Sequence, residues 1–246
     1  MKITFLGTAD SAGIPVHNCL CEVCELYRKD KKVNLSTCAY VEIDNSIILL
    51  DAGIENISNI FDSKKIEAVF LTHFHADHCL GLLRLRHSLD AIKCFHPKDK
   101  NGFSDLFKHP HSMQYNIIKD FESKEIKGIK FTAIPLEHSK KTLGYLLEYK
   151  NKKIAYLSDC FNIKEKTMDF LKTKNLDYVF IDACYDENKT KGNHFNYIQA
   201  SKVLDILNAK NSYLMHISHT TQNYILKNNI QLKYKYLKEN DEFNLS

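Results

Sequence analysis

Residues 73–78 read His-Phe-His-Ala-Asp-His and follow the apolar run 68–71, which predicts a buried strand. Because side chains alternate along an extended chain, we expect His73 and His75 to project to one side. The aspartate and last histidine should follow where the chain turns into a helix. Imidazole and carboxylate ligands together suit zinc, manganese or iron. The run therefore predicts a hydrolytic site with two metal ions, and a histidine-rich surface turn is the alternative.

Residues of the same ligand types also stand beyond three strand-like runs later in the chain. They are His138, Asp159 and His216. Strand ends let a rigid sheet hold catalytic groups while loops admit substrate. One such residue alone is more often a capping or hydrogen-bonding group, but together the three complete a set of seven ligands.

This ligand set resembles that of the metallo-β-lactamase superfamily, and the resemblance covers essentially the whole chain. It implies an α/β fold, the four-layer αββα sandwich, with residues 1–246 as a single hydrolase domain. It also implies one metal held by His73, His75 and His138, another by Asp77, His78 and His216, and Asp159 as the bridge. Two ions this close can share a hydroxide, which favours hydrolysis of phosphodiesters.

A separate CxCxxC cluster is formed by Cys19, Cys21 and Cys24. Three thiolates need one more ligand for a closed tetrahedral zinc site. His219 is the best candidate, because it lies three residues after His216 and is expected to face away from the catalytic pair. We expect a structural zinc that ties the loop around 19–24 to the C-terminal part of the fold. A redox pair or ordinary buried cysteines are the alternative.

With the cysteines included, the chain resembles the PhnP-like phosphoribosyl cyclic phosphodiesterases of phosphonate catabolism. The segments that carry this likeness include FLGTADSAGIP, LTHFHADHCLGL, PLEHSKKTLGYLLE, AYLSD, GNHF and HISH. The likeness implies hydrolysis of 5-phospho-ribose 1,2-cyclic phosphate to ribose 1,5-bisphosphate by two divalent ions, manganese or zinc. A homodimer is implied in the same way.

Asp77 and His194 are the catalytic candidates. By the resemblance, His194 contacts the phosphoryl group or protonates the leaving oxygen. The alternative is that His194 is a polar residue flanking a helix, since Asn196 and Gln199 read as a helix start signal.

Composition agrees with one soluble domain, because 246 residues can bury a substantial core. The chain opens on an alternating strand, 2–6, instead of a signal peptide, and no apolar run is long enough to span a bilayer, so we expect a cytoplasmic protein. The net charge of +4 comes without a dense basic stripe. Nucleic acid or a membrane is therefore not the expected partner. The resemblance implies a small cyclic phosphodiester as the partner instead.

Strand-like runs are expected near 2–6, 38–43, 46–50, 67–71, 129–135, 143–149, 153–158, 176–181 and 211–216. Two helices with clear apolar faces are expected, one carrying Ile163, Thr167, Phe170 and Leu171, the other Ala200, Val203, Leu204 and Leu207. Periodicity alone says only α/β.

Three other functions compete with this hypothesis. A transfer-RNA 3′-processing ribonuclease shares the metal core but normally carries an RNA-binding arm, and no long basic insertion marked by Gly and Pro is evident here. The B protein of pyrroloquinoline-quinone biosynthesis pairs the fold with a cysteine zinc site but commonly lacks the intact HxHxDH set. A non-catalytic scaffold would keep one tightly held zinc without two labile ions.

Overall fold

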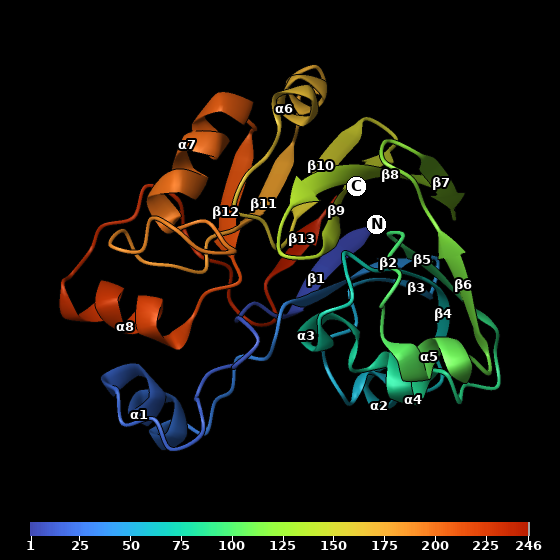
Figure 1. Cartoon of the computed structure of the whole chain (residues 1–246), viewed down its shortest axis with the longest axis horizontal. Helices are drawn as coiled ribbons and strands as arrows, with labels where there is room; N and C mark the ends of the chain where they lie inside the picture. Colours follow the sequence, from blue (N-terminus) through green and yellow to red (C-terminus); the bar gives the residue numbers. More distant parts are fainter. Residues whose placement is uncertain (246) are drawn as a thin grey trace.

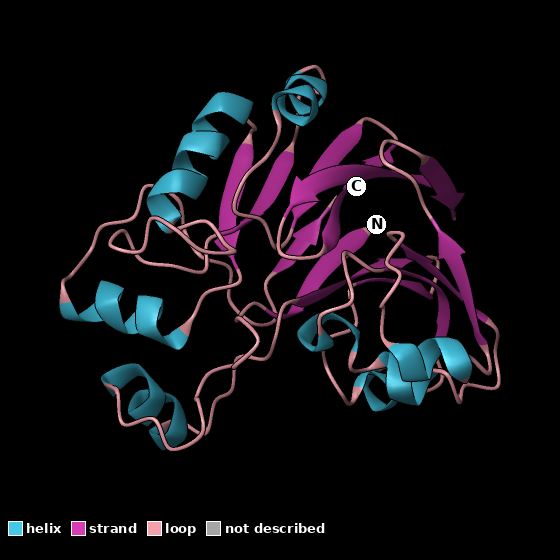
Figure 2. Cartoon of the chain, viewed as in Figure 1, coloured by secondary structure: helices cyan, strands magenta, loops and turns pink. Residues whose placement is uncertain are grey.

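Two mixed β-sheets face each other in the computed structural model, which describes residues 1–245 (Figures 1 and 2). The seven-stranded sheet contains, in spatial order, β13 (Glu242–Asn244), β1 (Lys2–Gly7), β2 (Cys38–Ile43), β3 (Ser46–Leu50), β4 (Lys65–Phe70), β5 (Ile92–His96) and β6 (Met113–Ile117). The six-stranded sheet contains β12 (Asn211–Met215), β11 (Tyr178–Asp182), β10 (Lys152–Leu157), β9 (Lys141–Tyr149), β8 (Ile129–Glu137) and β7 (Ser123–Ile126).

Helices cover the outer face of each sheet (Figure 1). The first sheet carries α2 (Ile57–Ile60), α3 (Ala76–Cys79), α4 (Leu82–Leu85) and α5 (Ser104–Lys108). The second carries α6 (Glu165–Lys172) and α7 (Tyr197–Leu207), while α1 (Glu22–Lys29) and α8 (His219–Lys227) pack on each other to one side. The expected αββα sandwich is therefore confirmed. No helix within residues 1–245 is long and apolar enough to cross a lipid bilayer.

Aromatic side chains from both sheets fill the space between them. The rings of Phe70 on β4 and Phe131 on β8 stack with centroids 4.0 Å apart. Phe5 on β1 meets Phe180 on β11 edge-on at 4.7 Å. All four rings are buried, and each contributes roughly 1.5–3 kcal/mol by leaving water. This core fixes the two sheets against each other and thereby the loops at their shared edge.

Strand direction brings the predicted ligand positions to one edge. β4 runs parallel to β3 and β5, and β10 runs parallel to β11, which runs parallel to β12. β8 points the same way as β10, because both are antiparallel to β9. The carboxyl ends of these strands therefore meet at the same side. Tyr145 ties the two sheets there, since its hydroxyl donates to the Leu71 carbonyl at 2.7 Å.

The nine strands expected from the sequence are present with shifts of one or two residues at most ends. Four strands were not predicted, namely β5, β6, β7 and β13. They are short, and all four lie at or next to a sheet edge, where alternation of apolar and polar residues is weak. Both expected helices are present as α6 and α7, with Ile163 just before the first turn of α6.

Candidate metal centres

The His-x-His-x-Asp-His run leaves β4 and enters α3, with His75 as the helix N-cap. His75 Nδ1 lies 2.7 Å from His73 Nε2 and 3.2 Å from His138 Nε2. The Asp159 Oδ2 atom is 3.7 Å from His73 Nε2. The ligand atoms of these four residues all lie within 4.8 Å of one another, so one cation can contact all of them.

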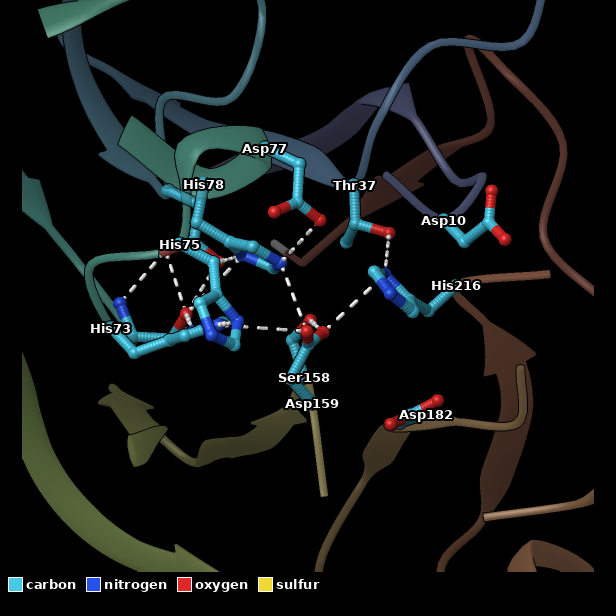
Figure 3. Close-up of polar contacts among 12 residues, drawn as sticks. Asp10, Thr37, His73, His75, Asp77, His78, Ser158, Asp159, Asp182 and His216 are labelled. Carbon is cyan, nitrogen blue, oxygen red and sulfur yellow. Dashed lines mark hydrogen bonds and ion pairs between the residues drawn. The ribbon is translucent and has the colours of Figure 1, made fainter. Parts of the chain in front are cut away.

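A second group shares Asp159 with the first (Figure 3). His78 Nε2 lies 3.1 Å from Asp159 Oδ2 and 3.4 Å from Asp77 Oδ2. His216 Nδ1 lies 3.3 Å from the other Asp159 oxygen, Oδ1. The structure thus brings the seven expected residues into two adjoining groups, with Asp159 between them.

Sharp turns just past strands aim three of the site's side chains. Asp51, Asp159 and His216 have φ values of 62°, 57° and 63°, the left-handed region that non-glycine residues rarely adopt. Each turn costs about 1 kcal/mol or more, and such strain persists only where surrounding structure imposes it. Ser158 supports the second turn, since its hydroxyl donates to Asp159 Oδ1 at 2.9 Å.

The buried carboxylate of Asp51 orients two of the histidines. His78 Nδ1 donates to Asp51 Oδ2 at 2.9 Å, which leaves Nε2 facing the metal group. The Thr72 hydroxyl donates to Asp51 Oδ1 at 2.9 Å and accepts from His73 Nδ1 at 3.0 Å. Carboxylate partners of this kind fix the tautomer and direction of ligating imidazoles.

Two other histidines are oriented by groups from distant segments. The Thr37 hydroxyl accepts from His216 Nδ1 at 2.9 Å and donates to the Ala9 carbonyl. His138 Nδ1 donates to the Asn193 carbonyl at 2.7 Å. In His138 the remaining nitrogen, Nε2, faces the first ligand group, whereas in His216 Nδ1 is also the nitrogen that lies next to Asp159 Oδ1.

The electrostatics of the site favour a cation. Burial lowers the pKa of His73, His75 and His138, so that these rings are neutral, as ligands must be. His78 differs: burial opposes its charged form, but the carboxylates of Asp159 and Asp51 hold its pKa well above the usual range. Buried negative charge thus exceeds positive charge here.

One buried atom tests whether the residues present fit a metal. His78 Nε2 is inaccessible to solvent and makes no hydrogen bond. In the neutral ring the Nδ1 proton is engaged by Asp51, and Nε2 presents its lone pair between Asp77 and Asp159. Such an orphaned atom is costly unless a cation binds it. The donor set therefore fits divalent metal binding.

The cysteine cluster also closes as the sequence predicts. Nδ1 of His219, the first residue of α8, lies 3.5, 3.6 and 3.7 Å from the sulfurs of Cys19, Cys21 and Cys24. A tetrahedral zinc with ordinary Zn–S and Zn–N bonds separates sulfur and nitrogen by about 3.6 Å. These four side chains therefore have the geometry of a closed structural zinc site.

Neighbouring contacts hold the cysteine loop in place. Arg28 donates to the carbonyls of Cys19 and Val16, both at 2.6 Å, and the backbone N–H of Val16 donates to the Cys24 sulfur at 3.4 Å. Beneath them, Ile14 and Ile217 pack in one buried cluster. The loop is thus joined to the segment that carries His216.

His194 lies beside the metal groups on the loop before α7. Its Nδ1 donates to Asp182 Oδ2 at 2.7 Å, and its ring stacks on His216 with centroids 4.9 Å apart. Burial disfavours the charged ring, but the Asp182 carboxylate raises the pKa of His194 to about 9. The expected helix start is present too, because Asn196 and Gln199 form a capping box for α7. His194 therefore flanks a helix and faces the site.

A cavity of about 360 Å³ opens over both metal groups. His194 and Asp77 line it together with other site residues, among them Asp10, Tyr185 and Asn193. Sequence reasoning missed four residues that orient ligands or His194: Thr37, Asp51, Thr72 and Asp182. The two aspartates carried a usable signal, since each ends or follows a strand as Asp159 does; the threonines carried none.

Comparison with known proteins identifies the family to which the chain belongs. Residues 47–217 match the family model described as the beta-lactamase superfamily domain, and the chain belongs to that family. Among solved structures it is similar to a diphosphatase of the PhnP family, with 26% identity, a TM-score of 0.81, and 99% of this chain and 98% of that one covered.

Curated relatives include a ribonuclease Z from Methanococcus maripaludis, 30% identical over 72% of this chain and 54% of its own length. The chain spans about half the length of this and another curated ribonuclease Z, from Methanosarcina acetivorans. Zn(2+)-bound PqqB from Methylobacterium extorquens shares the fold, with 18% identity over the full length of both chains and a TM-score of 0.79.

Replacing Asp51 by Asn should weaken metal binding roughly 10- to 100-fold, because His78 and His73 lose the partner that orients them. Chelator competition with Mn²⁺ or Zn²⁺ measures this. Asp177→Asn is the matched control, since Asp177 is buried and accepts from the Lys153 N–H far from the site. Equal losses in both variants would show that Asp51 acts only through general stability.

Replacing Cys21 by Ser should remove one zinc ion per chain and free the 14–35 segment from α8. Metal analysis gives the zinc count, and hydrogen exchange should speed up in α1 while β8–β10 stay protected. Val33→Ser, on the exposed end of the same segment, is the control that should change neither. A Cys21→Ser protein that keeps its full zinc content contradicts the four-ligand site.

Proposed function

We propose that this protein is a binuclear metal-dependent phosphodiesterase. The observation that carries the proposal is the pair of ligand groups sharing Asp159 at one edge of a superfamily fold. Two divalent ions, manganese or zinc, would supply Lewis acidity toward phosphoryl oxygens and an activated water. His73, His75 and His138 would hold one ion, Asp77, His78 and His216 the other, with Asp159 between them.

The size of the cavity supports a small substrate. Its volume of about 360 Å³ is at the low end of the range for pockets that enclose small molecules. Together with the likeness to the PhnP-family diphosphatase, this favours a compact phosphoester, and 5-phospho-ribose 1,2-cyclic phosphate is the substrate we propose. A small diphosphate is an alternative substrate, because in both hydrolysis reactions water attacks a phosphorus atom.

His194 is proposed to contact the phosphoryl group or to protonate the leaving oxygen. Its position in the cavity wall and its hydrogen bond to Asp182 support this role. The bond occupies Nδ1 and fixes the ring plane, so that Nε2 is the atom available to substrate. Asp182 itself is held by the backbone N–H groups of Cys160 and Cys184, at 2.8 and 3.0 Å.

Processing of transfer-RNA 3′ ends is the second candidate function. It is favoured by relatives named ribonuclease Z at 27–30% identity. A ribonuclease would use the same ligand groups on a larger substrate. PqqB-like or scaffold roles rest on fold similarity, on a 23% identical relative named coenzyme PQQ synthesis protein B, and on the cysteine site.

Purified, manganese-loaded protein should hydrolyse the ribosyl cyclic phosphate with a higher kcat/KM than 2′,3′-cyclic nucleotides or precursor transfer RNA. Product analysis and phosphate-release kinetics measure the three substrates side by side. Asp159→Asn should abolish turnover of all three, because both ligand groups lose their shared carboxylate. A preference for precursor transfer RNA would instead establish the second candidate.

Replacing His194 by Gln should lower kcat roughly 10²- to 10⁴-fold, the usual contribution of a general acid or base, with metal content unchanged. Asp182→Asn should give a smaller drop, because the ring stays but loses its orientation. His111→Gln, at an exposed histidine on the surface, is the control. Turnover unaffected by His194→Gln would remove this residue from the mechanism.

A further inference from the structure

A third constellation of ligand-type side chains lies in the wall of the same cavity. The Cys184 sulfur and one nitrogen each from His194 and His216 lie within 4.8 Å of one another. Cys184 comes shortly after β11 and is 3% exposed. Only His216 belongs to the ligand groups described above, so the thiol and the second imidazole add soft donors beside the catalytic groups.

These three side chains are held in place before any ion binds. The Cys184 carbonyl accepts from the hydroxyls of Ser218 and Thr221 at 2.9 and 2.7 Å, and its N–H donates to Asp182. His194 and His216 are fixed through their Nδ1 atoms by Asp182 and Thr37. A prearranged set loses little conformational entropy on binding an ion.

An oxygen ligand stands next to the thiol. The Cys184 sulfur lies 4.0 Å from Asp10 Oδ2, while Asp10 Oδ1 accepts from the N–H of Ala12. Asp10 lines the cavity and is visible near His216 in Figure 3. One thiolate, two imidazoles and one carboxylate suit zinc or cadmium, whereas manganese prefers oxygen-rich sites.

We propose that Cys184, His194 and His216, with the Asp10 carboxylate beside the thiol, form an inhibitory site for a thiophilic divalent ion such as zinc or cadmium. A neutral imidazole offers one lone pair, so His216 serves either this ion or the catalytic group of Asp77, His78 and Asp159. The ion would also occupy His194. The inhibitory effect rests on the proposed phosphodiesterase function, but binding of the ion does not.

The test uses the whole chain with zinc bound at the cysteine site and manganese bound at the two catalytic ligand groups. Cd²⁺ is the probe. Wild type is compared with Cys184→Ser and Cys184→Ala, and with Cys94→Ala, which removes a fully buried thiol from β5. Two readouts are taken: cadmium bound per chain with the cadmium–thiolate absorption band, and hydrolysis of bis(p-nitrophenyl) phosphate.

Wild type and Cys94→Ala should bind one cadmium ion more per chain than either Cys184 variant. Their hydrolysis should be inhibited at a cadmium concentration more than about tenfold lower, since even an outer-shell partner changes metal affinity by that factor. Equal cadmium counts and band intensities in all four proteins would overturn the site. Loss of the ion without a shift in inhibition would overturn the inhibitory role. If no phosphodiester is hydrolysed, the proposed function fails while the binding readout still decides the site.

Discussion

The rest of the structure depends on the contacts between the buried carboxylate of Asp159 and the imidazoles around it. The carboxylate lies between imidazoles of both ligand groups, 3.7 Å from His73 Nε2 in the first and 3.1 Å from His78 Nε2 in the second. His78 and His216 hold its pKa well below the usual range although burial opposes ionisation. An ionised carboxylate in the interior is costly without compensating positive charge. The fold must therefore place cations or imidazoles around this carboxylate. The residues at the strand ends provide the imidazoles.

The two packed sheets hold these residues rigidly in place. Aromatic contacts between the sheets fix strands β4, β10 and β12. The left-handed turns at Asp159 and His216 direct their side chains inward. Outer partners such as Asp51 and Thr37 then set which imidazole nitrogen faces the site. Backbone strain and buried polar groups weaken a fold where nothing compensates them, and both are present at this site.

The cysteine site plays a different part. It joins α1 to α8, and its ligand His219 follows closely after β12 and His216, so it stabilises the segment that carries a candidate metal ligand. Soft donors therefore gather on both sides of His216: a closed set at His219, and Cys184 in the cavity wall. A harder ion and a thiophilic ion can be separated in one protein by such a division of donors.

Sequence alone determined the ligand types. The HxHxDH spacing and the strand-end positions of His138, Asp159 and His216 indicated the two groups that share Asp159. The CxCxxC run indicated the cysteine site. Likeness to a known family supplied the two-sheet arrangement. Local patterns of this kind can be recognised in a sequence because few residue types can act as metal ligands. Tertiary structure alone decided the partners: Asp51 at His78, Thr37 at His216, Asp182 at His194 and Cys184 beside both rings. Those pairs join segments up to 179 residues apart, and hydrogen bonds between distant segments leave no periodicity in the chain.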